Sequence, residues 1–226
     1  MKKLVFVFIL SLAGISVYAG ENTISLGFQA PITFMFGSSN QIISNNIDVT
    51  KLYSIEYGKI LYSTGANIKG KFSGDGGWGG MFKVNCFFPY LIISDTNVSG
   101  PLLFRDASSK IGYTEFDPAF IVGAGGGILK RFYINDMFHI SLDLGPEFEF
   151  DVVDVDTFRY LIITVGIFSE LSFEFHVSKH LFFDIGLNYD LLLGGGVYGY
   201  KNASIIVNTG EFGFSVSPSI SIGYKF

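Results

Sequence analysis

Residues 211–226 alternate between apolar side chains and small or polar ones. Successive side chains of a β-strand face opposite sides, so this pattern predicts a strand with one apolar face and one polar face. Strands in soluble proteins commonly span about 5 to 6 residues, and a strand this long favours a wall that crosses a membrane. The predicted apolar face contains Phe212, Phe214, Val216, Pro218, Ile220, Ile222, Tyr224 and Phe226.

Residues 24–36 repeat the arrangement, with Ile24, Leu26 and Phe28 on one face and Ser25 and Gln29 on the other. Both ends of the chain after residue 20 are therefore predicted strands. Pairing the first with the last would close a barrel, which removes the unpaired edges that hydrocarbon cannot satisfy.

Six further strands are predicted between these two. A change of phase near Gly58 predicts a bulge there, and residues 73–77 form a turn signal. Eight strands result, or ten if residues 63–65 form a hairpin turn. Longer connections alternate with short ones, as in outer-membrane barrels, and the exposed loops are predicted at 37–51, 95–109, 154–158 and 194–208. The six strands are predicted at residues 53–72, 78–92, 116–124, 140–152, 161–177 and 183–193.

Charged residues fall on the inward face of these strands. The interior of an eight-stranded barrel is about filled by side chains, so the pattern predicts a hydrogen-bonded and ion-paired plug, with a narrow cation path as the alternative. Phe168 and Phe182 also face inward among polar residues. The inward set contains Glu115, Asp117, Asp143, Glu147, Glu149, Glu170, Glu174, Asp184 and Asp190, with Lys69, Lys71 and Lys83 as basic partners.

Aromatic side chains gather near the predicted periplasmic strand ends, where amphipathic rings favour the level of the lipid headgroups. They are Trp78, Phe132, Tyr133, Phe182 and Tyr224.

Catalytic chemistry finds little support in the pattern. His139 and Asp143 share a face but lie about 13 Å apart along one strand, too far to pair directly. His176 lies closer to Glu174, yet no local motif pairs a serine with a base. The glycine-rich run at 123–127 lacks the lysine–serine pair of a phosphate loop, and small residues on a crowded strand explain it better. We therefore predict a protein that is not an enzyme and assign no catalytic, cofactor-binding or metal-binding residues.

Composition agrees with a membrane wall of strands. Hydrophobic residues make up 49% of the 226 residues and charged ones only 15%, yet beyond the amino terminus no apolar run approaches the ~20 residues of a spanning helix. A net charge of −5 gives no support for nucleic-acid binding. Cys86 is the single cysteine, so an internal disulfide is excluded, and it is expected to be a small apolar residue on a strand.

The amino terminus has the features of an export signal. Lys2 and Lys3 precede the apolar residues 4–12, and small or modest residues lead to Ala19. We predict cleavage between Ala19 and Gly20, which gives a signal peptide at 1–19 and a single barrel domain at 20–226. An uncleaved anchor is the alternative, and the lack of a cysteine near this point disfavours a lipoprotein.

Together the signal, the alternation to the very end and the terminal Tyr224-Lys225-Phe226 resemble the small outer-membrane barrels of the OmpA, OmpX and OmpW kind. The resemblance implies an all-β fold, a single closed antiparallel transmembrane barrel in the outer membrane of a Gram-negative-type bacterium. It implies that Phe226 and Tyr224 belong to the signal read by the barrel-assembly machinery. The use of Phe and Gly, 25 and 28 residues, is also similar to that of spirochaetal outer-membrane barrels.

Three functions follow as hypotheses. The first is a structural or surface-interaction barrel with a filled polar lumen, surrounded by lipid and meeting extracellular ligands through its loops. The second is a transporter or narrow channel for small hydrophobic molecules or ions, as OmpW-like barrels are thought to be. The third is a lipid-modifying barrel enzyme, motivated only by the inward histidines and acids.

Overall fold

The structure is a computed structural model that describes residues 20–43, 51–99, 116–155, 158–200 and 203–226. In these ranges the chain forms strands joined by short turns, and none of it forms a helix long and apolar enough to cross a membrane. The strands are β1 (Gly20–Gln29), β2 (Ile32–Ile43), β3 (Lys51–Gly74), β4 (Trp78–Ser99), β5 (Phe116–Asn135), β6 (Phe138–Val155), β7 (Phe158–His176), β8 (Leu181–Tyr200) and β9 (Ala203–Lys225).

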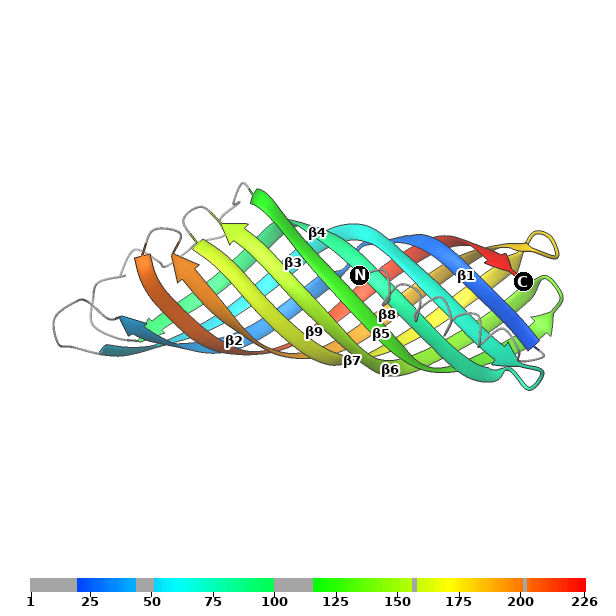
Figure 1. Cartoon of the computed structure of the whole chain (residues 1–226), viewed down its shortest axis with the longest axis horizontal. Helices are drawn as coiled ribbons and strands as arrows, with labels where there is room; N and C mark the ends of the chain where they lie inside the picture. The colour runs from blue at the N-terminus through cyan, green and yellow to red at the C-terminus, as the bar shows by residue number, and fades with distance from the viewer. Residues whose placement is uncertain (1–19, 44–50, 100–115, 156–157, 201–202) are drawn as a thin grey trace, which may run out of the picture.

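The nine strands occupy eight positions in one closed antiparallel wall (Figure 1). β1 and β2 are consecutive segments of one position, because both pair with β3 on one side and with β9 on the other. Pro31 has no N–H and interrupts the ladder, but its carbonyl still accepts a hydrogen bond from the Ser63 amide at 3.0 Å. The prediction of eight strands is confirmed. The ten-stranded alternative is wrong, since residues 63–65 continue through β3.

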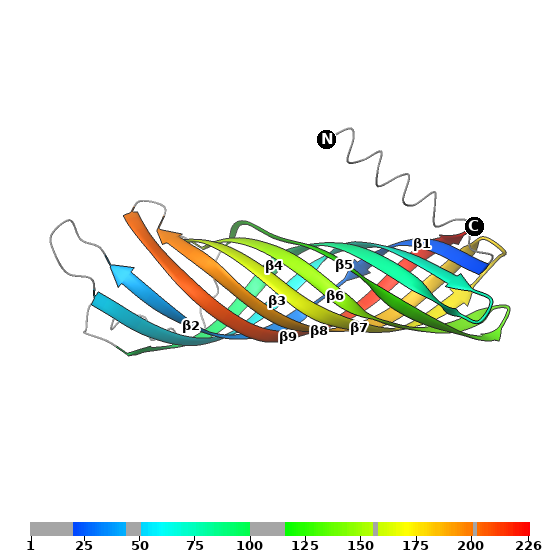
Figure 2. The ribbon, with the colours of Figure 1, turned by 60° about the horizontal axis from the view of Figure 1, so that its bottom comes forward.

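Closure of the first strand on the last is also confirmed, with Thr23 paired to Lys225 and Gln29 to Ser219. The wall is strongly staggered. Starting at Met35, we step from each residue to its register partner on the next strand until the circuit of the barrel is complete. The circuit ends at Ser25, which lies ten residues from Met35 in the β1–β2 strand position. Such a stagger accompanies tilted strands, which run obliquely to the long axis in Figures 1 and 2. Side chains far apart in sequence therefore meet inside.

Short turns join β3 to β4, β5 to β6 and β7 to β8 at one end of the barrel, which we call the turn end; the opposite end is the loop end (Figure 1). The predicted turn at 73–77 is confirmed. The Gly77 amide donates to the Gly74 carbonyl at 2.8 Å, and Gly77 has a φ of 75°, a conformation that favours glycine.

The strands extend further toward the loop end than the sequence pattern indicates. β3, β4 and β9 contain 24, 22 and 23 residues, about twice the 9–11 residues that cross a bilayer. Much of the predicted loops at 37–51, 95–109 and 194–208 is therefore strand, and that prediction is wrong for residues 37–43, 95–99 and most of 194–208. β6 and β7 likewise extend into the predicted loop at 154–158, while residues 44–50 and 100–115 lie outside the described ranges.

The predicted bulge lies elsewhere. Gly58 pairs regularly with Phe36 and Asp95. The register with β4 shifts instead between Tyr62 and Ser63, where Tyr90 is left without a partner beside Pro89. A proline that cannot donate to the ladder accounts for an irregularity at this site better than a glycine does.

The two faces of the wall match the predicted alternation. On β9 the even-numbered side chains point outward from Phe212 to Tyr224, and the odd-numbered residues are buried from Glu211 to Gly223. Outward apolar side chains reach the turn end, where Trp78, Phe132 and Tyr224 are exposed as predicted for an aromatic belt. Tyr133 is also exposed there, but its side chain contacts the inward residues Ser73 and His139. Phe182 is the exception. It is buried inside, so its assignment to the belt is wrong and its inward assignment is confirmed.

In one part of the wall, neighbouring strands are not paired by ladder hydrogen bonds. β4 and β5 pair from Trp78 with Lys130 up to Phe87 with Ile121, and within the described residues their pairing goes no further. β4 nevertheless continues to Ser99 and β5 starts at Phe116. We call this segment, beyond Phe87 and Ile121, the β4–β5 seam.

Candidate functional site

The interior of the turn-end half is crossed by buried ion pairs. Lys83 on β4 and Asp190 on β8 have three strand positions between them in either direction around the wall, yet Nζ and Oδ1 are 3.3 Å apart. The same ammonium lies 2.7 Å from Glu147 Oε2 and 4.0 Å from the centre of the Phe168 ring. A lysine and an acid that meet from opposite walls leave no open passage between them at this level.

A second ion-paired group lies beside the first. Lys69 on β3 contacts Glu170 on the opposite strand β7, and its Nζ is 3.6 Å from Asp184 Oδ2. Lys71 contacts Asp143 at 3.1 Å and Glu174 at 3.3 Å. These side chains are almost wholly buried. The predicted ion-paired filling is therefore present, and we call it the plug: Lys69, Lys71, Lys83 and Arg131 with the carboxylates around them.

Most of the predicted inward residues are part of this interior. Glu115 lies outside the described residues, and the side chain of Asp117 is not described. The other seven predicted acids and the three lysines are buried. Two important charges were missed, Glu21 and Arg131. Both have the inward parity of their strands, which is the signal that would have found them.

Glycine makes room for the plug. A Cβ on Gly125 would lie 3.1 Å from Glu147 Cβ and Phe168 Cε1, and 3.2 Å from Lys83 Cε. The glycine-rich run at 123–127 thus belongs to a crowded strand, as predicted from its sequence.

Serine and lysine groups also meet inside. Lys71 Nζ donates to Ser141 Oγ and to Ser172 Oγ, both at 2.6 Å. Nucleophilic catalysis would require Lys71 to act as a base that accepts a proton from serine. Lys71 is instead held between two carboxylates, and all three side chains are buried. The arrangement is that of a structural network.

The inward side chains change character toward the loop end. Six of the eight strand positions place an apolar residue there, while β6 contributes Glu149 and Asp151. Leu61, Phe87 and Ile121 pack together at the base of the β4–β5 seam. We call this group the apolar layer, and each member is at most 6% exposed. Its members are Met35, Leu61, Phe87, Ile121, Ile162 and Leu192.

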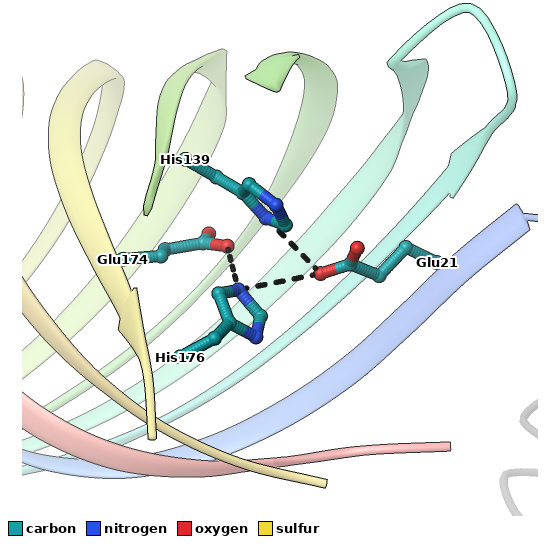
Figure 3. Close-up of side chains that lie close together, drawn as sticks. All are labelled: Glu21, His139, Glu174 and His176. Atoms are coloured by element: carbon teal, nitrogen blue, oxygen red, sulfur yellow. Dashed lines mark ion pairs between the residues drawn. The ribbon is translucent and has the colours of Figure 1, made fainter. Parts of the chain in front are cut away.

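Two histidines and two glutamates meet at the turn end (Figure 3). Glu21 Oε1 lies 3.4 Å from His139 Nδ1 and 3.6 Å from His176 Nε2, and His176 Nε2 lies 3.9 Å from Glu174 Oε2. All four side chains are buried, and one oxygen or nitrogen of each lies within 4.8 Å of the others. We call these residues the His–Glu cluster. Nitrogen and carboxylate ligands in this arrangement are suited to a divalent metal ion.

Neighbouring side chains hold the cluster in place. Lys225 Nζ lies 2.7 Å from Glu21 Oε2, and Arg131 Nε lies 3.1 Å from Glu174 Oε2. The imidazoles lie against each other with ring centres 4.3 Å apart. His139 meets the edge of Tyr133 at 4.8 Å, and His176 stacks on Phe182 at 5.3 Å, which explains why that phenylalanine is inside.

His139 and Asp143 do not pair, as their spacing predicted. Asp143 contacts Lys71, whereas His139 faces Glu21. The meeting of both histidines with Glu21 was not predicted, because it depends on how the first strand closes against the others.

Comparisons with known proteins find likeness in structure alone. No family model matches the sequence, and no curated protein does. The outer membrane protein OprG from Pseudomonas aeruginosa is similar with a TM-score of 0.59 and 15% identity, over 92% of this chain and 97% of that chain. The attachment invasion locus protein Ail of Yersinia pestis gives 0.46 and 12%, over 92% and 99%. Neisserial surface protein A gives 0.45 and 11%, over 88% and 97%.

The likeness to OprG and the apolar exterior indicate the same fold. The chain has the fold of an outer-membrane β-barrel, as its resemblance to that family implied. The similarity to spirochaetal barrels stays a prediction.

Proposed function

We propose that this protein is a surface-exposed barrel of the outer membrane, closed to ions through its lumen, that acts by presenting its tall wall and loops to the environment. The observation that carries this proposal is the contact of Lys83 with Asp190 from opposite walls, which leaves the lumen filled. A role that needs an open aqueous pore fits this interior poorly. A non-enzymatic role fits the plug, whose lysine and arginine side chains are paired with carboxylates.

The height of the wall supports a role at the surface. Outward apolar side chains reach the turn end, as with Trp78, Met137 and Val177. The hydrocarbon layer therefore surrounds the turn-end half, and the remaining length of β3, β4 and β9 extends beyond it on the loop side. This extension offers extended backbone and side chains to an extracellular ligand.

Export and assembly complete the proposal. Cleavage between Ala19 and Gly20 would leave β1 intact, since β1 begins at Gly20. Tyr224 and Phe226, at the end of the closing strand, would be read by the barrel-assembly machinery.

Conductance tests the closed lumen. Purified protein in planar bilayers is expected to give no steady ion-conducting steps, and heat-dependent gel mobility of the recovered protein would establish that it was folded. Steady steps from folded protein would overturn the proposal.

Surface labelling tests the orientation. In a Cys86→Ser background, Ala203→Cys at the loop end is expected to react with a membrane-impermeant maleimide on intact cells. Lys179→Cys, exposed in the turn between β7 and β8, is the matched control and should react only after permeabilisation. Labelling of Lys179→Cys alone on intact cells would contradict a surface role for the loop end.

A second function is favoured by the β4–β5 seam. The apolar layer lies at its base, with Leu61, Phe87 and Ile121 in mutual contact. A small hydrophobic molecule that enters from the loop end would meet apolar side chains beside a part of the wall without ladder hydrogen bonds. From the base of the seam, next to Phe87 and Ile121 and at the border of the turn-end half, it could leave sideways into the membrane without crossing the plug.

Locking the seam tests this second function. Phe88→Cys with Phe120→Cys, in the Cys86→Ser background, would join two outward side chains just beyond the last paired residues. If the seam passes hydrophobic molecules, the oxidised variant should take up a fluorescent hydrophobic dye several-fold more slowly than the Phe88→Cys control, and reductant should restore the rate. Equal uptake in the oxidised and reduced forms would remove this function.

A further inference from the structure

We propose that the His–Glu cluster binds one divalent transition-metal ion, best matched by Zn²⁺, through Glu21, His139, Glu174 and His176. Imidazole and carboxylate are ligands that Zn²⁺ accepts, and four protein ligands are the number found in its structural sites. Such a site is separate from the function proposed above, which needs no metal.

The four ligand atoms lie within 4.8 Å of one another, and two of their separations already match those around a single ion. Zn²⁺ binds histidine nitrogen and carboxylate oxygen at about 2.0–2.2 Å, so the ligand atoms of a tetrahedral site lie about 3.3–3.6 Å apart. Glu21 Oε1 is 3.4 Å from His139 Nδ1 and 3.6 Å from His176 Nε2. His176 Nε2 and Glu174 Oε2 are slightly wider apart at 3.9 Å. Small rotations of the side chains would complete the site.

The four atoms are buried, and each lacks a hydrogen bond within the described part of the chain. They are Glu21 Oε1, His139 Nδ1, Glu174 Oε2 and His176 Nε2. They are not isolated, since Arg131 lies near both carboxylate oxygens and Glu21 Oε1 faces both imidazoles. A shared cation would satisfy the bonding capacity that these contacts leave open at four buried atoms from three strands.

The outer oxygens of both glutamates are anchored by other groups. Glu21 Oε2 accepts from Lys225 at 2.7 Å, and Glu174 Oε1 accepts from Lys71 and from Arg131 at 3.3 Å. Partners of this kind orient the ligands of metal sites. The carboxylates therefore direct their other oxygens, Glu21 Oε1 and Glu174 Oε2, toward the imidazoles (Figure 3).

Arg131 is the competing cation. Its Nε lies 3.1 Å from Glu174 Oε2, and its Nη1 lies 3.6 Å from Glu21 Oε1. Each carboxylate oxygen has two lone pairs, so one oxygen can accept from a guanidinium and also bind a metal. Lys225 and Arg131 pair with the same two glutamates that would hold the ion, and Lys71 pairs with Glu174 and with Asp143.

The position of the cluster suggests its role. Glu21 is the second residue of β1, His139 the second of β6 and His176 the last of β7, so an ion would arrive from the turn end without crossing the plug. β1 and β6 have three strand positions between them in either direction. A bound ion would therefore fasten the first strand to the opposite wall, and its binding energy would add to folding stability.

Equilibrium dialysis of the folded protein against Zn²⁺, with elemental analysis, tests the site. The wild type is expected to bind about one Zn²⁺ per chain, and cobalt in place of zinc should give the intense visible bands of tetrahedral nitrogen and oxygen coordination. The double variant His139→Asn with His176→Gln should bind at least ~100-fold more weakly, beyond the 10–100-fold range that changes to outer partners cause.

The third histidine of the chain provides the matched control. His180 lies at the same end but outside the cluster, with Nδ1 3.1 Å from the Lys225 carbonyl, and His180→Gln should bind like the wild type. Heat-dependent gel mobility would confirm folding of each variant. If the double variant fails to fold, the single variants and the wild-type cobalt spectrum decide instead. Failure of the folded wild type to bind micromolar Zn²⁺, or equal binding by the double variant, would overturn the proposal.

Discussion

Lys225 on the last strand donates to Glu21 on the first, with 2.7 Å between Nζ and Oε2. One residue further, the Phe226 amide donates to the Asn22 carbonyl at 3.0 Å. A side-chain ion pair and a backbone hydrogen bond thus join the first and last strands at the turn end.

Deletion of Phe226 is expected to lower the amount of folded protein in the outer membrane several-fold. It removes the aromatic terminus and the hydrogen bond to Asn22. Heat-dependent gel mobility of membrane fractions measures the folded amount. Deletion of residues 44–50, which connect β2 to β3 in the sequence, is the comparison and should have a smaller effect. Equal surface levels for the two deletions would refute the prediction.

Lys83→Met should lower the free energy of unfolding by about 3–5 kcal/mol, since it leaves buried Glu147 and Asp190 without their shared cation. Urea titration of protein refolded in detergent measures the loss. Lys130→Met is the control on the neighbouring strand. Its ammonium lies over the outer rings of Trp78 and Phe132, a contact whose loss costs about 1 kcal/mol or less. Similar losses in both variants would mean that the plug adds little stability.

Gly223→Ala should destabilise the barrel by about 1–3 kcal/mol, because the added methyl would overlap the inward ring of Phe182. Gly210→Ala on the same strand has open space around the new carbon and should stay within about 0.5 kcal/mol of the wild type. Adding Phe182→Leu to Gly223→Ala should recover part of the loss. A Gly223→Ala protein as stable as the Gly210→Ala protein would contradict this packing.

Mature protein isolated from outer membranes should begin at Gly20, because a signal peptidase would cut after Ala19. Intact mass measurement and amino-terminal sequencing decide this directly. A mass that retains residues 1–19 would support the uncleaved anchor instead.

Alternation predicted the strands well wherever one face meets lipid and the other is buried, as for His139 and Ile140 on β6. It failed at residues 95–99, which continue β4 beyond the band of lipid-facing side chains. There the physical reason for alternation disappears, because a wall with water available on both sides need not separate polar from apolar residues. The Pro89 irregularity was missed for another reason, since a register shift depends on the partner strand.

The His–Glu cluster could have been predicted in part. His139 and Glu174 are direct register partners between β6 and β7, and His176 lies two residues further on the same face. The proximity of His139, Glu174 and His176 could be predicted once the turn between β6 and β7 is known. The position of Glu21 could not be predicted, because it depends on the stagger accumulated around the whole wall and on closure of the first strand against β9.

Ion pairs between opposite walls also have a mechanical consequence. Lys83 with Asp190 and Lys69 with Glu170 act as struts, so the turn-end half cannot flatten under lateral membrane pressure without separating buried charges. In the apolar layer Leu61, Phe87 and Ile121 pack together from neighbouring strands through dispersion contacts, which have no preferred direction. The turn-end half of the barrel should therefore be stiffer than the loop-end half. Shape fluctuations should be largest beside the β4–β5 seam, where ladder pairing is missing.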